Sequence, residues 1–238
     1  MTFLRRTTGS LVGSSGVIDG ALLDSKAAIH SSVVDAIKEL QVIYKDTTHS
    51  STIGTDQDST ILLNALEALF IHGLKDYTTG WSRKSKSSLR GVEPNFWTYL
   101  LIFSHKDTIQ RIDSLRQINS DVGRSRAWLR LALNDGLLGS YLKMMMTDKV
   151  SGRRFYEKCA FMRDVDSLDI ISRYVTGIEI YRFDLAVNSG LLNRWPNAPL
   201  IIAGLVESSE RYVIINYCRT LLSGNILLQY NVGISDLV

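Results

Sequence analysis

Cysteine is scarce in this sequence. The 238 residues include two cysteines, Cys159 and Cys218, which lie far apart and form no CxxC motif. This argues against a disulfide scaffold and fits a reducing compartment, where thiols stay unpaired. The four histidines and the two cysteines show no zinc-ligand spacing. We therefore expect neither a bound metal nor a cofactor.

Long apolar runs and a large excess of charge are missing as well. The longest uninterrupted apolar runs fall far short of the roughly 20 residues that span a bilayer. The segment TTGSLVGSSG, which follows MTFLRR, has no continuous apolar core, so we expect no secretory signal. A net charge of +3 is too small for a polycation that coats nucleic acid. These absences favour a cytoplasmic protein with at most peripheral membrane association and no nucleic-acid partner.

No catalytic motif occurs either. The sequence contains no GxSxG, GxxxxGK[ST] or HExxH, and the glycines of GSLVGSSG lack the lysine of a phosphate loop. Asp164 and Asp166 form a DxD sequence in a polar turn, where the expected role of an aspartate is to cap the next helix rather than to bind metal. We expect that the protein is not an enzyme.

The patterns that are present are helical. Apolar residues recur three and four positions apart over Ala27–Tyr44 and again from about Ser59 to Lys75, and no rhythm of alternating strands appears. The expected fold class is all-α, a compact single-domain bundle of seven or eight helices. Residues 1–25, rich in Ser, Thr and Gly, predict a mostly disordered leader. The apolar residues 206–238 predict a tail of uncertain structure.

The helix expected at residues 121–135, DVGRSRAWLRLALND, carries three arginines. Arg126 and Arg130 lie one turn apart at the edge of its apolar face and are expected to form an exposed pair, while Arg124 lies on another side. The alternative is that each arginine pairs with an acidic residue of a neighbouring helix. His72, at the edge of the apolar face of an earlier helix, is expected to be partly exposed.

Four sequence blocks resemble a known family in their order and spacing. They are LLNALEALFIHGLKD, EPNFWTYLLIFS, INSDVGRSRAWLRLALNDGLLGSYLKMMM and YVTGIEIYRFDL. Together they resemble the RUN domain over about residues 29–200, which places an expected RUN domain at residues 27–205. ALFIHGLKD, together with LLNRWPNAPLIIAGL, is most similar to the pleckstrin-homology-domain-containing family M adaptors.

The resemblance implies a function that the residue patterns alone do not give. RUN domains are non-catalytic helical modules that bind small GTPases of the Rab, Rap and Arf-like groups, or motor proteins. In family M adaptors the basic residues of the GRxR block and the preceding histidine are associated with GTPase binding. The matching positions are His72, Arg124 and Arg126, and Arg130 and Lys106 are nearby candidates by charge only.

The resemblance also implies a cellular role and leaves one alternative open. An adaptor of this kind would bind a GTP-loaded lysosomal Arf-like GTPase or a Rab and be recruited from the cytoplasm to late endosomes and lysosomes. It would act there in lysosome positioning and autophagosome–lysosome fusion, possible partners being tethering or motor proteins. The alternative is an adaptor that binds a kinesin or a helical peptide independently of nucleotide. Because no pleckstrin-homology domain follows, we expect a fragment, a short isoform or a distinct product.

Overall fold

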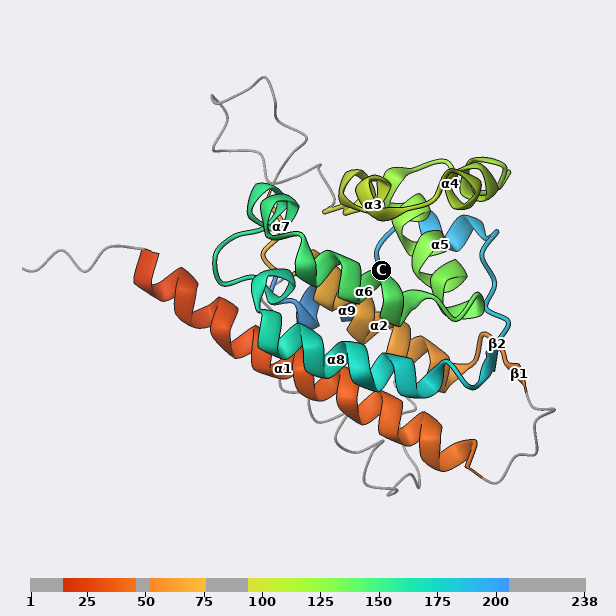
Figure 1. Ribbon diagram of the computed structural model, residues 1–238, viewed down its shortest axis with the longest axis horizontal. Helices are drawn as coiled ribbons and strands as arrows, with labels where there is room; N and C mark the ends of the chain where they lie inside the picture. Colours follow the sequence, from red (N-terminus) through yellow and green to blue (C-terminus); the bar gives the residue numbers. More distant parts are fainter. Residues whose placement is uncertain (1–14, 46–51, 76–93, 206–238) are drawn as a thin grey trace, which may run out of the picture. The chain divides into compact units, whose positions relative to one another are not determined.

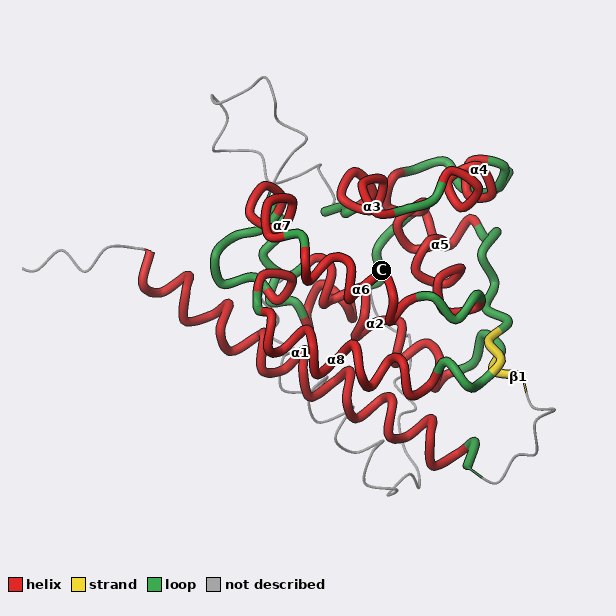
Figure 2. The backbone as a smooth tube through the Cα atoms, viewed as in Figure 1, coloured by secondary structure: helices red, strands yellow, loops and turns green. Residues whose placement is uncertain are grey.

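The computed structural model describes residues 15–45, 52–75 and 94–205, with side chains from residue 24 onward. These residues form nine α-helices, two 3₁₀ helices and one pair of very short strands (Figures 1 and 2). The expected all-α class is confirmed, although the expected number of helices was seven or eight. The elements in chain order are α1 (Ser15–Ile43), β1 (Thr52–Ile53), α2 (Gln57–Ile71), α3 (Trp97–Phe103), α4 (Lys106–Asp113), α5 (Asp121–Asn134), α6 (Leu138–Thr147), α7 (Lys149–Phe155), η1 (Phe161–Arg163), α8 (Val165–Ile178), β2 (Arg182–Phe183), η2 (Gly190–Asn193) and α9 (Asn197–Ile202).

Helix α1 begins well before the predicted position. It starts at Ser15, so the prediction of a disordered leader over residues 1–25 is wrong for its last part; residues 1–14 lie outside the described residues. Ile18 and Leu22 are four positions apart, a helical spacing that the surrounding serines and glycines obscured. Further along, α1 buries an apolar stripe against α2 and α8.

Helix α2 runs through the centre of the protein, and its N-terminus is fixed by a capping box. The Asp56 carboxylate accepts the backbone N–H of Ser59 at 2.8 Å, and the Ser59 hydroxyl oxygen accepts the N–H of Asp56 at 3.0 Å. The two bonds satisfy orphan donors of the first turn. The cap is therefore Asp56 rather than a residue inside the helix. Most of α2 is buried, since α1, α5 and α9 all pack against it.

Parallel strands β1 and β2 join distant parts of the chain. Thr52 pairs with Arg182 and Ile53 pairs with Phe183, and the N–H of Asp184 donates to the carbonyl of Ile53 at 2.9 Å. The pairing ties the segment before α2 to the segment after α8, at the right of Figure 1. It occupies too few residues to leave an alternating pattern in the sequence, so no strand was predicted here.

One asparagine bonds the segment from η2 to α9 to the residues around the start of α5. The Asn193 side-chain oxygen accepts the N–H groups of Asn119 and Ser120 at 2.8 and 3.2 Å, and its amide donates to the carbonyl of Gln117 at 2.8 Å. A Cβ at Gly123 would overlap this side-chain oxygen, so a residue without a side chain is needed there. Asn193 thus joins the segment to the N-terminus of α5.

No helix within the described ranges combines the length and the apolar composition that crossing a bilayer requires. The predicted tail at 206–238 lies outside the described residues.

Removal of residues 190–205 should destabilise the helical body. Leu192, Trp195 and Ile201 are all more than nine-tenths buried, and burial of each large apolar side chain contributes about 1.5–3 kcal/mol. We expect a chain of residues 1–189 to unfold at a clearly lower urea concentration than a chain of residues 1–205, measured by circular dichroism. Equal midpoints would show that the segment adds no stability.

Candidate functional site

Helix α5 contains most of the predicted site, and it is buried nearly all round. Residues from Val122 to Leu133 are buried with the exception of Arg124. The helix packs against α2, α3, α4, α6 and η2, so it has no broad face left for solvent. Figure 1 shows α5 below α3 and α4 and to the right of α6. The sequence pattern predicted an amphipathic helix because it treated the cationic positions as a solvent face.

Arg126 and Arg130 bind the same buried carboxylate. The Glu67 Oε1 atom of α2 accepts Nε–H of Arg126 at 2.9 Å and Nη1–H of Arg130 at 3.0 Å. The exposed fraction is 0% for Glu67 and 6% for each arginine. Nη1 of Arg130 also donates to the carbonyl of Arg126 at 2.9 Å. We call Glu67, Arg126 and Arg130 the Arg–Glu–Arg cluster.

Arg126 also holds the segment that contains η2. Its Nη1 atom donates to the carbonyl oxygens of Leu191 at 3.1 Å and Arg194 at 2.6 Å. The guanidinium lies 5.6 Å from the ring centroid of Trp195, a cation–π geometry, and the Trp195 indole N–H donates to the carbonyl of Pro94 at 2.6 Å. Arg126 is thus a buried link between α2, α5 and the η2 segment.

The Arg–Glu–Arg cluster holds two cations and one carboxylate in a desolvated site. Burial lowers the pKa of Arg130; the Glu67 carboxylate opposes this shift and the nearby Arg126 adds to it. Oε2 of Glu67 has no hydrogen-bond partner among the described residues. An arginine remains charged even when buried, so Glu67 is the group that compensates both guanidinium ions. Loss of Glu67 would leave two buried charges unpaired.

The predicted exposure of Arg126 and Arg130 is therefore wrong, and the alternative of internal pairing is confirmed for both. Their guanidinium groups are committed to Glu67 and to backbone carbonyls, so neither can touch a partner in this conformation. Glu67 was not among the predicted site residues. Its signal was a single carboxylate in the run LLNALEALFI, where Asn64 is the only other polar residue.

The predicted partial exposure of His72 is also wrong. Its side chain is 0% exposed, and Nδ1 accepts the backbone N–H of Phe161 at 2.9 Å. Beside it, the Tyr156 hydroxyl donates to the carbonyl of Phe70 at 2.9 Å. His72 follows the last residue of α2, so these bonds fasten the end of α2 to the segment that leads into η1.

Arg124 and Lys106 are the two predicted site residues that solvent reaches. The Arg124 side chain is 33% exposed; its Nη1 lies 2.7 Å from the carboxylate of Asp121 and its Nε lies 3.6 Å from that of Asp113. Lys106 is exposed at the start of α4, with no ion pair within the described ranges. Asp113 ends α4, so this short helix connects the two cations along one side of the protein.

Two further exposed residues, Leu191 and Arg116, were not predicted. They are the sequence neighbours of Gly190 and Gln117, and the N–H of Gly190 donates to the side-chain oxygen of Gln117 at 3.1 Å. Leu191 is 86% exposed, and Arg116 is exposed as well. No sequence pattern distinguishes Leu191, because its exposure results from the backbone path fixed by Arg126. We call Lys106, Arg116, Arg124 and Leu191 the α4–α5 surface.

Comparison with known proteins identifies the class. The RUN domain family matches residues 61–189, more than half of the chain, and the protein therefore belongs to the RUN domain family. Pleckstrin homology domain-containing family M member 2 of mouse and of human are each 29% identical to it over 138 residues, which is 58% of this chain. The chain covers 12% of the length of these relatives. The predicted resemblance is thus confirmed.

The Arg–Glu–Arg cluster gives a direct test of what holds α2 to α5. Glu67→Gln should lower the free energy of unfolding by about 3–5 kcal/mol, because it leaves two buried guanidinium ions uncompensated. Asp135→Asn is the matched control. It breaks the solvent-exposed Arg111–Asp135 pair at 2.7 Å and should cost no more than about 1 kcal/mol. Urea unfolding of both variants measures the difference, and equal effects would contradict the assigned role of Glu67.

Proposed function

We propose that the protein is a non-catalytic effector and adaptor that binds a GTP-loaded small GTPase through the α4–α5 surface. Membership in the RUN domain family is the observation that carries this proposal, since the family resemblance implies a binding module rather than an enzyme. The similarity to pleckstrin homology domain-containing family M member 2 supports the same reading.

The α4–α5 surface has the chemistry of a protein contact. It includes the cations Lys106, Arg116 and Arg124 and one aliphatic side chain, Leu191, that is almost fully solvated. Interfaces combine an apolar centre that excludes water with charged groups that steer and orient the partner. The Arg124 side chain is one-third exposed, so its guanidinium can reach an acidic group of a partner. A partner with an acidic rim around an apolar depression fits this surface.

The buried residues of the predicted site act in this proposal as positioning residues. Arg126 binds the carbonyl oxygens of Leu191 and Arg194, and so it fixes the direction in which Leu191 projects. Arg130 and Glu67 hold Arg126 in turn. His72 stabilises the far end of α2 and is remote from the contact in this scheme.

The proposed partner is the lysosomal Arf-like GTPase or a Rab of late endosomes. The protein would then be recruited from the cytoplasm to late endosomes and lysosomes, where it would help to position lysosomes and promote autophagosome–lysosome fusion. The family M resemblance supports this narrower proposal.

Charge reversal at Arg124 tests whether this residue contacts the partner or only stabilises the fold. Arg124→Glu should weaken binding of the GTP-locked GTPase by about tenfold or more through repulsion of an acidic partner, with little change in stability. Lys143→Glu on α6 is the control, because it makes the same charge change at an exposed residue outside the α4–α5 surface. Arg126→Glu should lose stability instead, since it places a second carboxylate beside Glu67. Calorimetry and urea unfolding measure the two effects.

Two outcomes would argue against this assignment. Unchanged affinity in Arg124→Glu would remove the α4–α5 surface from the contact. Equal affinity for the GDP-bound and GTP-bound forms would favour the nucleotide-independent adaptor instead.

A further inference from the structure

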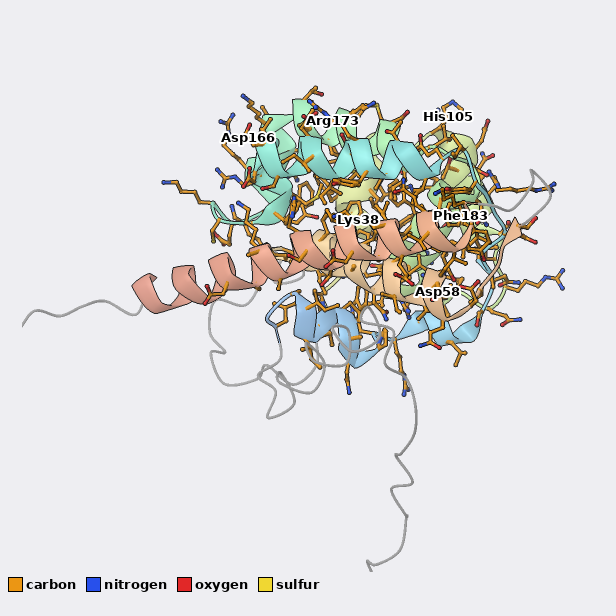
Figure 3. The ribbon with its side chains drawn as sticks, turned by 90° about the horizontal axis from the view of Figure 1, so that it is seen from below. Lys38, Asp58, His105, Asp166, Arg173 and Phe183 are labelled. Carbon is orange, nitrogen blue, oxygen red and sulfur yellow. The ribbon has the colours of Figure 1, made fainter. Side chains whose placement is uncertain are left out.

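A second candidate site lies away from the α4–α5 surface. A pocket of about 220 Å³ opens between α6, α7, η1 and the start of α8, and we call it the α6–α8 pocket. In Figure 1, α7 lies on the left of the protein and α4 and α5 on the right. Figure 3, a second view, places Asp166 in the first turn of α8 at the opposite end from His105, which precedes α4. One partner could therefore occupy each site at the same time.

The pocket has an apolar floor. Met145, Met162 and Leu168 line it and are 2%, 3% and 1% exposed, and Met146 adds a third thioether. Methionine side chains are flexible and polarizable, so they adapt to apolar groups of different shape. The floor offers neither a charge nor a strong hydrogen-bonding group to a ligand. It therefore selects an apolar group.

The rim of the pocket is cationic. Lys149, Arg153 and Arg163 line it, and none of them forms an ion pair with a carboxylate in the described part of the chain. The rim carboxylate, Asp148, already accepts the N–H groups of Val150 and Ser151 at 3.0 and 3.1 Å. Hydrogen bonds from Ser151 hold the pKa of Asp148 below its usual value, so this group stays ionised and satisfied.

A second carboxylate, close to the pocket, also has partners of its own. Asp164 caps α8 and forms an ion pair with Lys26 of α1, so it does not compensate the three rim cations. The lining thus carries three cations against one carboxylate. This imbalance favours an anionic ligand around an apolar centre.

The size of the pocket decides between ligand classes. Pockets for whole small molecules occupy about 300–1,000 Å³, which is more than the pocket provides. An apolar cavity of about 150 Å³ is large enough for a benzene ring. At 220 Å³ the α6–α8 pocket has room for one large side chain. A peptide can insert one such side chain against the apolar floor. Its acidic residues on either side then stay outside the pocket, where they contact the cationic rim.

The geometry points to the α6–α8 pocket as a docking site for an acidic peptide segment of a partner protein, which inserts one aromatic or large aliphatic side chain between the methionines. The acidic residues on either side of that side chain face Lys149, Arg153 and Arg163. This interaction goes beyond the proposed GTPase contact, because it recruits a second protein at another end of the domain and does not depend on nucleotide.

The test uses the full chain and two synthetic peptides. One peptide has a single phenylalanine flanked by three glutamates on each side, and the other replaces the phenylalanine by serine. Fluorescence anisotropy of labelled peptides should show binding of the phenylalanine peptide at least about tenfold tighter, as the insertion of a ring into an apolar pocket requires. Equal affinities of the two peptides would show that the protein recognises only their charge, and would overturn the proposal.

Adjacent arginines provide a matched pair of variants. Arg153 lines the pocket, whereas Arg154, the next residue of α7, lies over the ring of Phe155 at 5.3 Å from its centroid. Both are exposed, so neither charge reversal should unfold the protein. Arg153→Glu should weaken the phenylalanine peptide by about tenfold and Arg154→Glu by much less. Equal losses would indicate a diffuse electrostatic effect and contradict a defined site.

Gly152 lines the pocket and has space for a Cβ. A Cβ at this position would lie 3.9 Å from Cγ of Arg163 and 4.0 Å from the carbonyl of Met162, which is ordinary contact. Gly152→Leu should therefore occupy the pocket and reduce peptide affinity about tenfold, while Gly152→Ala should change it little. Urea midpoints of both variants establish that each is folded. Retained affinity in the folded Gly152→Leu protein would overturn the proposal.

A lipid surface is the competing explanation for the cationic rim. Vesicles with and without phosphatidylserine distinguish it. If phosphatidylserine vesicles bind in a way that Arg153→Glu abolishes, and the phenylalanine peptide does not bind, then the rim recognises membrane and the peptide proposal fails. Neither peptide measurement involves a GTPase, so its result is independent of the proposed function.

Discussion

The two ion pairs that Glu67 forms with Arg126 and Arg130 are the interaction on which the rest of the structure depends. It joins α2 to α5, and through Arg126 it also reaches the backbone that leads into α9. Buried ion pairs contribute little net stability compared with apolar packing, but the removal of one member is costly. The cluster therefore specifies one arrangement of three segments more than it strengthens that arrangement. Side chains that these three segments carry at the protein surface are therefore held in defined positions relative to one another.

Much of the fold was predictable from local patterns. Asp164 caps α8 as expected, and Ser120 caps α5 with its side-chain oxygen 2.9 Å from the N–H of Gly123. Gly136 follows α5 with a φ of 63°, a conformation that glycine adopts readily after the last turn of a helix. These features are local because capping depends on residues a few positions apart. The start of α1 was not predictable in this way, because its polar residues hid the helical spacing.

The exposure of three predicted site residues, His72, Arg126 and Arg130, was assigned wrongly. A helical wheel distinguishes apolar from charged positions, and it cannot show that a carboxylate on another helix, 59 positions earlier, meets Arg126. His72 was misplaced for a related reason, since its partner is a backbone N–H at Phe161. Arg124 was treated as separate from the pair, and it is the arginine of this helix that reaches solvent. Whether each of these side chains is exposed depends on contacts with residues distant in sequence, which helical periodicity does not reveal.

The way in which Arg126 holds the η2 segment has an evolutionary consequence. Its guanidinium binds carbonyl oxygens of residues 191 and 194, which every amino acid possesses, and it makes no demand on their side chains. The hydrogen bonds that Arg126 donates are therefore independent of which side chains occupy residues 191 and 194. Mutations there can alter the exposed side chain while the backbone keeps its path. The side chain at residue 191 can therefore change without rebuilding the scaffold that presents it.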